Sequence, residues 1–176
     1  TTVNLDFILV LIYSYTFGSI PFGLIITKIF LKKDVRNIGS GNIGATNVLR
    51  AGNKFLAVLT LVLDVLKGYL TIFITSIYFS DLVYFSALIC FIAHIFPIWL
   101  RFKGGKGVAT YLGVILGLSF NLAVIFGLVW LVILFSFKYS SLSSIVSSLL
   151  VFVYSIFLGN FSLSLYLFIV FIIVLY

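Results

Sequence analysis

Apolar stretches of about 20 residues recur along almost the whole chain, and this repetition limits the possible folds more than any other feature. A helix of about 20 residues is long enough to cross the hydrocarbon core of a bilayer. Hydrophobic residues make up 63% of the 176 and charged residues only 9%, which leaves too little polar surface for a soluble domain of this length. The sequence therefore predicts an all-α, polytopic integral membrane bundle.

Short polar or Gly/Ser/Asn breaks divide the apolar sequence into separate runs. We place the runs at residues 5–31, 55–79, 82–100, 107–119, 121–137, 142–158 and 162–176. This predicts a single domain, residues 1–176, with seven transmembrane helices. The fourth run is short and the last breaks are weak, so five or six spans remain open. Within the first run, Gly18-Ser-Ile-Pro21 predicts a kink at which Ser19 can bond a freed backbone group.

The basic residues indicate the orientation of the chain. Ten of the eleven Lys and Arg lie in or beside alternate loops, whereas the opposite loops carry Asp6 and Asp81. Basic loops remain in the cytoplasm, so the N-terminus is predicted to lie outside. Anionic lipid headgroups can balance the net charge of +7, and nucleic acid is not expected as a partner. An anion-binding site is the more specific interpretation.

The longest of these cytoplasmic loops, residues 34–50, is rich in glycine and in hydrogen-bonding side chains. Its glycines allow a close approach to a ligand, and its neutral donors and arginines suit a phosphate. The residues concerned are Arg36, Gly39, Ser40, Gly41, Asn42, Gly44, Thr46, Asn47 and Arg50. The run from Gly39 to Gly44 also matches G-x-G-x-x-G, but a dinucleotide site requires a preceding strand, and here a membrane helix precedes it. A flexible turn with interfacial arginines is the simpler alternative.

The next basic loop, residues 101–110, has the same character in a shorter form. Glycines surround Lys106, and a helix is predicted to begin directly afterwards, where free N–H groups and the helix dipole favour a phosphate. The loop lacks the first glycine of a Walker A motif. Arg101 and Lys103 could equally anchor a helix end in the membrane interface.

Three ionisable residues are predicted to support this site from within the spans. Asp64 and Lys67 share one helical face of the second span, and such groups face the bundle interior because burial in lipid is costly. A structural ion pair that only satisfies itself is an equally open alternative for these two residues. His94, the only histidine, lies at the cytoplasmic end of the third span, where a structural role is favoured over general-base catalysis. The sequence contains no zinc spacing or acidic cluster, so we expect no metal.

Together these segments resemble the bacterial acyl-phosphate:glycerol-3-phosphate acyltransferase family, PlsY. The resemblance covers about the first two-thirds of the chain and rests on Gly18-Ser-Ile-Pro-Phe-Gly23, Arg36-Asn-Ile-Gly-Ser-Gly-Asn-Ile-Gly-Ala-Thr-Asn-Val-Leu-Arg50, Asp64-Val-Leu-Lys-Gly68, His94-Ile-Phe-Pro97 and Phe102-Lys-Gly-Gly-Lys-Gly-Val-Ala-Thr110. It implies seven helices in a bacterial cytoplasmic membrane. It also implies transfer of a fatty acyl group from acyl phosphate to the sn-1 hydroxyl of glycerol 3-phosphate, without a cofactor, giving lysophosphatidic acid.

The resemblance also assigns roles to residues of the two loops, at the cytoplasmic face. Ser40, Arg50 and Lys106 resemble the family's active-site residues, with Arg50 and Lys106 as phosphate ligands. The substrate-binding set then comprises Arg36, Gly41, Asn42, Thr46, Asn47, Lys103, Gly104 and Gly105. From their positions in the spans, we also expect Asp64, Lys67 and His94 to be supporting residues. A phosphate of the substrate could accept the proton of the attacking hydroxyl, so no protein nucleophile is required.

One feature of the family is missing and two other functions compete. The family usually continues into a basic tail with a His-Arg-x-x-Asn motif, which does not occur before Tyr176, so we expect residues 1–176 to be a truncated segment. A transporter of a phosphorylated anion would predict discontinuous helices and an inverted repeat, and no repeat is visible. A non-catalytic scaffold would leave the two cationic loops unexplained.

Overall fold

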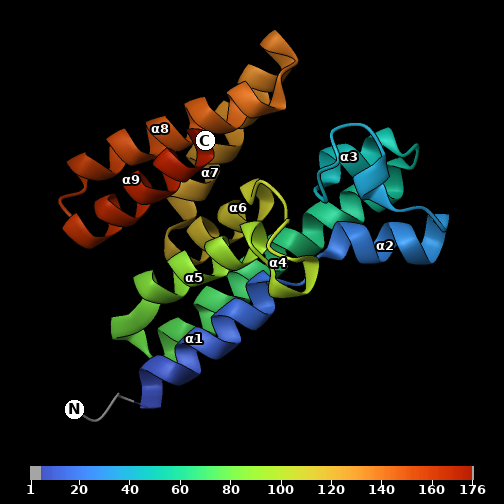
Figure 1. Cartoon of the computed structure of the whole chain (residues 1–176). Helices are drawn as coiled ribbons and strands as arrows, with labels where there is room; N and C mark the ends of the chain where they lie inside the picture. Colours follow the sequence, from blue (N-terminus) through green and yellow to red (C-terminus); the bar gives the residue numbers. More distant parts are fainter. Residues whose placement is uncertain (1–4, 176) are drawn as a thin grey trace. The chain divides into compact units, whose positions relative to one another are not determined.

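The computed structural model describes residues 5–175, and all regular secondary structure in this range is helical (Figure 1). The α-helices are α1 (Leu5–Gly18), α2 (Phe22–Leu31), α3 (Ala45–Arg50), α4 (Lys54–Tyr78), α5 (Val83–Ile95), α6 (Val108–Leu118), α7 (Phe120–Phe137), α8 (Ser140–Phe157) and α9 (Phe161–Leu175). Short 3-10 turns are η1 (Val35–Asn37), η2 (Ser80–Leu82) and η3 (Ile98–Leu100). The chain divides into two compact units after Gly117. The single domain expected from the sequence stays a prediction.

Five helical segments of the described chain are long and apolar enough to cross a membrane. They are Leu5–Leu31, Lys54–Tyr78, Ser80–Leu100, Phe120–Phe137 and Ser140–Phe157. The prediction of a polytopic helical membrane protein is confirmed. The apolar helices α6 and α9 have 11 and 15 residues, and at 1.5 Å per residue neither reaches the ~30 Å of a hydrocarbon core. Seven crossings therefore stay a prediction.

In the first unit, α1, α4 and α5 pack against one another and bury polar side chains (Figure 1). The Ser86 hydroxyl lies 2.8 Å from Ser14 Oγ and accepts a hydrogen bond from Thr75 Oγ1 at 2.8 Å. Large apolar side chains such as Leu61 and Phe73 on α4 are exposed instead. This distribution suits lipid, which solvates apolar groups but offers no hydrogen bonds to hydroxyls.

The predicted kink is present as a complete break between α1 and α2. Ser19 Oγ donates to the Thr16 carbonyl at 3.0 Å, and Trp99 Nε1 donates to the Ser19 carbonyl at 2.8 Å. These bonds satisfy backbone groups that the break removes from the helical pattern. The break allows α2 to leave the direction of α1 and to pack on α4 beside α3.

Glycines allow α4 and α6 to pack with their backbones in contact. A Cβ atom added to Gly113 would lie 1.9 Å from the Val65 carbonyl oxygen, and one added to Gly68 would lie 2.3 Å from the Thr110 carbonyl oxygen. Gly113 and Gly117 form a G-x-x-x-G pattern, and close backbone approach is the usual role of this pattern in membranes. This contact holds the start of α6, and with it the second basic loop, against the middle of α4.

The second unit consists of α7, α8 and α9, with α8 packed against both other helices. Hydroxyl groups of α8 make the interhelical hydrogen bonds. Ser144 Oγ accepts from Trp130 Nε1 at 3.1 Å, and Ser155 Oγ donates to Ser164 Oγ at 3.0 Å. Serine therefore serves here, as in the first unit, to join helices within the apolar phase.

Candidate active site

The buried side chain of Asn47 holds the first basic loop together through hydrogen bonds to its backbone. Its side-chain amide donates to the carbonyl oxygens of Val35, Ile38 and Asn42 at 2.9, 2.9 and 2.7 Å, and its Oδ1 accepts from the Ser40 backbone N–H at 3.1 Å. The residue is 1% exposed. The sequence predicts Asn47 as a substrate ligand, but both ends of its side chain are committed to the loop. These bonds hold the loop in its observed shape, and a contact between Asn47 and substrate stays a prediction.

The two arginines of this loop differ in their surroundings. Arg36 Nη2 and Nε donate to the Asp34 carboxylate at 2.7 and 3.0 Å, while Lys28 Nζ lies 3.7 Å from the same group. The side-chain hydrogen bonds from Arg36 hold the pKa of Asp34 far below its ordinary value and raise the pKa of Arg36. Arg50, in contrast, is exposed, and no other residue between 5 and 175 forms an ion pair or side-chain hydrogen bond with it.

Backbone geometry brings the Arg50 side chain over the glycines. Gly39 has φ of +52° and Gly41 of +72°, a region that side-chain-bearing residues rarely adopt. A Cβ on Gly39 would lie 3.0 Å from Arg50 Cδ. The Arg50 stem thus lies across Gly39, next to the exposed Ser40, and its guanidinium is available for an anion. Asn42 Oδ1 accepts from the Gly44 N–H at 2.9 Å, and Thr46 is exposed on α3.

The second basic loop folds back onto the end of α5. The N–H groups of Gly104 and Gly105 donate to the carbonyl oxygens of Ile95 and His94 at 2.9 and 3.1 Å. A Cβ on Gly104 would lie 2.1 Å from the His94 oxygen, so no larger residue fits there. Lys103 and Lys106, on either side of these glycines, are exposed.

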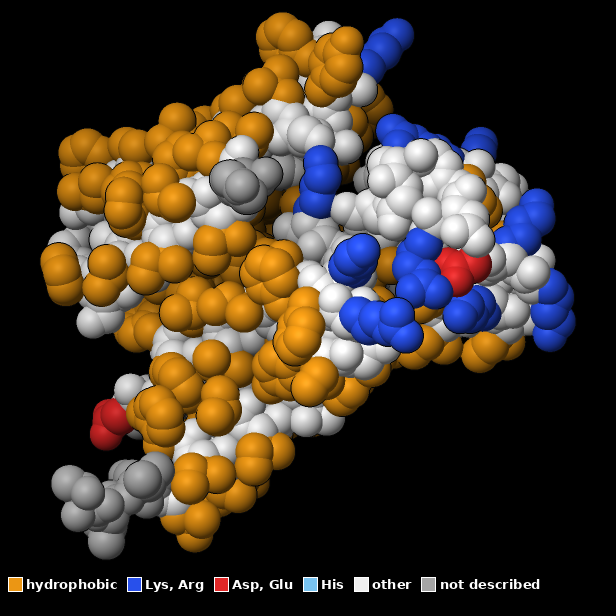
Figure 2. Space-filling model, in the orientation of Figure 1, with side chains coloured by type: hydrophobic (Ala, Val, Ile, Leu, Met, Phe, Trp, Pro, Cys, Tyr) orange, Lys and Arg blue, Asp and Glu red, His pale blue; other side chains and the backbone are white. Residues whose placement is uncertain are grey.

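The two loops meet at Gly105. A Cβ at this position would lie 2.3 Å from His94 Nε2 and 3.2 Å from Cγ1 of Ile43, which belongs to the first loop. The structure therefore brings together the two loops that the sequence could only describe separately. Figure 2 shows the result, with Lys and Arg side chains of the first unit gathered at the end formed by α2, α3 and the loops.

Beneath this meeting point lies a buried polar cluster, the Lys67 cluster, formed by Asp64, Lys67, His94 and Thr110. Lys67 Nζ lies 2.7 Å from Asp64 Oδ1 and 2.8 Å from His94 Nδ1. Thr110 Oγ1 lies 3.1 Å from the same imidazole nitrogen. Lys67 also donates to the Ile20 carbonyl at 2.7 Å, in the break between α1 and α2. The predicted interior position of Asp64 and Lys67 is confirmed.

Comparison with known proteins assigns the chain to a family. A family model for glycerol-3-phosphate acyltransferase matches residues 8–176. The chain belongs to this family. The glycerol-3-phosphate acyltransferase of Pelagibacter ubique is 48% identical to it over 172 residues, which are 98% of this chain and 90% of that protein. The one from Mesorhizobium japonicum is 52% identical over 144 residues, 82% of this chain and 74% of that protein.

Solved structures agree with this assignment. The crystal structure of PlsY (YgiH), an integral membrane glycerol 3-phosphate acyltransferase, in its glycerol 3-phosphate form matches with a TM-score of 0.92 and 36% identity. The match covers 97% of this chain and 87% of that one. The lysophosphatidic acid form of PlsY matches with a TM-score of 0.87 at the same coverage. The resemblance read from the motifs is thereby confirmed.

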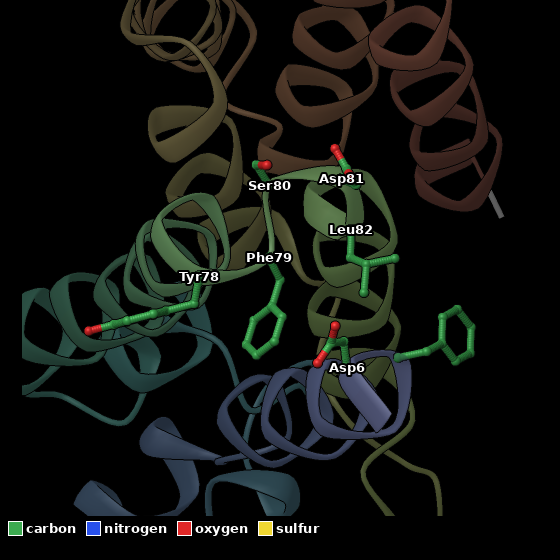
Figure 3. Close-up of a pocket in the computed structure, with 7 residues that line it drawn as sticks. Asp6, Tyr78, Phe79, Ser80, Asp81 and Leu82 are labelled. Atoms are coloured by element: carbon green, nitrogen blue, oxygen red, sulfur yellow. The ribbon is translucent and has the colours of Figure 1, made fainter. Parts of the chain in front are cut away.

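A pocket elsewhere on this acyltransferase is separate from the two loops. Its volume is about 290 Å³ and it is lined by Asp6, Phe7 and residues 78–82 (Figure 3). Asp6 and Phe7 belong to the first turn of α1, and residues 78–82 lie at the C-terminal end of α4, whereas the first basic loop leads into the N-terminal end of α4. A helix of 25 residues spans roughly 37 Å, so the pocket lies far from the glycines. Among the described residues no group of three or more His, Cys, Asp and Glu could hold a metal ion.

Sequence reasoning missed three contributors to the candidate site. Ile43 carries the contact between the loops, Thr110 joins the Lys67 cluster, and the Ile20 carbonyl accepts from Lys67. Each lies within or beside a recognised motif. Only Thr110 has a side chain that could have signalled a polar role, because Ile43 acts through packing and Ile20 through its backbone.

Proposed function

We propose that this chain transfers a fatty acyl group from acyl phosphate to the sn-1 hydroxyl of glycerol 3-phosphate, giving lysophosphatidic acid. The observation that carries the proposal is the meeting of the two glycine-rich, cationic loops at Ile43 and Gly105. Both substrates carry a phosphate, and each loop brings cations suited to one. Family membership and the glycerol 3-phosphate and lysophosphatidic acid forms of PlsY support the same reaction.

The reaction needs positioned phosphates more than it needs a protein nucleophile. The glycerol hydroxyl oxygen attacks the acyl carbonyl, a carbon–oxygen bond forms, and the bond from the carbonyl to the phosphate breaks. Inorganic phosphate leaves, and the hydroxyl proton passes to a phosphate oxygen. Arg50 and Lys106 bind the phosphates in this proposal, and Ser40, next to Arg50, hydrogen-bonds the reacting groups.

The remaining residues of the predicted set fall into two groups. Asn42, Thr46 and Lys103 contribute hydrogen bonds or charge at the rim of the two loops. The second group shapes the loops. Arg36 and Asn47 have partners within the first loop, and the glycines permit the backbone path at Gly41, Gly104 and Gly105.

The proposed orientation places both loops at the cytoplasmic face of a bacterial membrane, with seven membrane helices and the N-terminus outside. The clustering of Lys and Arg at one end of the first unit supports this orientation. Glycerol 3-phosphate would then reach the loops from the cytoplasm and the acyl donor from the membrane. The enzyme assignment leaves the alternative of an anion transporter without a supporting observation.

The test is acyl transfer by the purified protein, with palmitoyl phosphate or palmitoyl coenzyme A as the donor and glycerol 3-phosphate as the acceptor. With palmitoyl phosphate as the donor, we expect lysophosphatidic acid and inorganic phosphate. With palmitoyl coenzyme A as the donor, we expect no lysophosphatidic acid. The Arg50→Ala variant should lose roughly 10- to 100-fold in kcat/KM, as expected for a charged hydrogen bond worth about 1.5–3 kcal/mol. Lys33→Ala, an exposed cation of the same end, serves as the control.

Two results would count against the proposal. Transfer from the coenzyme A ester but not from the phosphate would overturn the donor. An Arg50→Ala variant with the kcat/KM of the control would overturn the role of Arg50 while leaving the reaction intact.

A further inference from the structure

Lys67 is the centre of a buried cluster that the proposed chemistry does not use directly. Its ammonium group contacts Asp64 Oδ1, His94 Nδ1 and the Ile20 carbonyl oxygen at 2.7, 2.8 and 2.7 Å. An ammonium group has three hydrogens and no acceptor, so these contacts use its full capacity. His94 Nδ1 must then accept, and the imidazole carries its hydrogen on Nε2. Lys67 thus selects the tautomer of His94 and fixes the plane of its ring.

The Nε2 edge of that ring supports the second basic loop. Nε2 lies 2.3 Å from the position that a Cβ of Gly105 would occupy, so the ring and the Gly105 backbone are in direct contact. The His94 carbonyl also accepts the Gly105 N–H at 3.1 Å. Cγ1 of Ile43, in the first loop, lies 3.2 Å from the same Cβ position. The His94 ring, Gly105 and Ile43 therefore meet at one point between the two loops.

The cluster also connects the loops to the membrane helices. Lys67 is on α4, His94 is on α5, and the Ile20 carbonyl belongs to the break between α1 and α2. Asp64, Lys67 and His94 are 1%, 3% and 4% exposed, so these contacts are made out of water, where an ion pair restricts geometry strongly.

We propose that Asp64, Lys67 and His94 are positioning residues for acyl transfer, which hold the Gly104–Gly105 backbone at the distance from the first loop that lets both loops bind phosphate at once. The inference rests on the proposed assignment of these loops to the substrates. It assigns no contact with substrate to any of the three residues. Its competitor is a pair that satisfies itself and serves only the stability of α4.

A double variant separates positioning from stability. Lys67→Met alone would leave a buried carboxylate without a partner and could prevent folding, whereas Asp64→Asn with Lys67→Met removes both charges together. A second variant, His94→Asn, keeps an oxygen acceptor for Lys67 but removes the Nε2 edge. Ser86→Ala is the matched control, because it removes hydrogen bonds between α1, α4 and α5 without touching the loops.

Thermal unfolding and steady-state kinetics with palmitoyl phosphate are measured for each variant. We expect both the double variant and His94→Asn to raise the KM for glycerol 3-phosphate and to lower kcat/KM by roughly 10- to 100-fold, the cost of misplacing a bound group by about 1 Å. This loss should persist at temperatures where each variant is fully folded. The control should show a lower Tm with an unchanged KM.

The inference is overturned if the folded double variant and His94→Asn keep the KM and kcat of the unaltered protein. It is equally overturned if the activity of these two variants falls only in proportion to their loss of thermal stability, as we expect for Ser86→Ala. Failure of the proposed function looks different, because the unaltered protein would then make no lysophosphatidic acid.

Discussion

At the scale of single residues, similar side chains in the first basic loop have different roles because their neighbours differ. Asn47 is buried and holds the loop together, whereas Asn42 and Ser40 lie nearer the surface. Arg36 is paired with Asp34, whereas Arg50 lies across the glycines without such a partner among the described residues. The chemistry of the proposed phosphate site thus depends on which asparagine and which arginine remain accessible to a ligand.

Asn47→Asp tests the structural role of this residue. The substitution keeps the size of the side chain but removes both amide hydrogens, so three loop carbonyls would face a carboxylate. We expect the stability of the protein to fall by about 2 kcal/mol, the usual cost of leaving a buried polar group unsatisfied. The loss should appear in thermal unfolding as well as in activity. An inactive variant of unchanged stability would instead indicate that Asn47 binds substrate.

Gly105→Ala tests the meeting point of the loops. The added methyl group would overlap His94 Nε2 at 2.3 Å and crowd Ile43, so the loops must separate. We expect kcat/KM to fall roughly 100-fold. Gly127→Ala in α7 is the control, because its added Cβ meets no described atom within 4 Å, and alanine should cost nothing in a helix. Equal activity of the two variants would contradict the proposed geometry.

The Asp34–Arg36 pair predicts a defined pH behaviour. Arg36 depresses the folded-state pKa of Asp34, so the pair stabilises the folded protein. This stabilisation is fully present above the unfolded-state pKa of about 3.9, and it is lost as the pH falls through the folded-state pKa. Asp34 should therefore remain ionised at about pH 4. In Arg36→Gln its pKa should return toward the ordinary value. Carbon-13 NMR of labelled aspartate carboxyls would record both titrations, and identical curves would refute the pairing.

At the scale of helices, α1, α4 and α5 are joined by hydroxyl groups and α4 and α6 by glycines. Both devices work in lipid, where apolar burial between helices provides no driving force and packing and hydrogen bonds must replace it. The break at residues 19–21 belongs to this scale as well. It separates α2 from α1, so that the first basic loop can approach the second.

Ser86→Ala tests the hydroxyl contacts between helices. The substitution removes bonds to Ser14 and Thr75, each worth about 0.6 kcal/mol in membrane proteins. We therefore expect stability to fall by about 1 kcal/mol, seen as a lower Tm in detergent. The KM for glycerol 3-phosphate should not change, because the contacts lie within the helical packing. A raised KM would show that these hydroxyls reach the active site.

At the scale of the whole molecule, the proposed orientation can be tested with single cysteines. The only native cysteine, Cys90, is fully buried and gives a low background for thiol reagents. In intact cells lacking the outer membrane barrier, a membrane-impermeant maleimide should label Asp81→Cys. The same reagent should label Lys33→Cys only after the cells are opened. The reverse pattern would show that the basic loops lie outside.

The sequence by itself determined the helical, membrane-spanning class and the family of this acyltransferase. The apolar runs place the helices closely, and Gly18-Ser-Ile-Pro21 marks the observed break. These features are local, since hydropathy, proline and glycine act on the segment that contains them. The motifs likewise marked the two loops that we propose to bind phosphate, because phosphate binding demands recognisable residue types at short spacing.

Only the tertiary structure decided how those residues are used. Lys67 reaches the Ile20 carbonyl and His94, which are 47 and 27 positions away, and Ile43 meets Gly105. No local pattern specifies such contacts, because they depend on how separate helices pack. Packing also decided that Asn47 is buried in its loop while Arg50 faces outward. The folded molecule decides which polar groups bond within the protein and which remain accessible to a substrate.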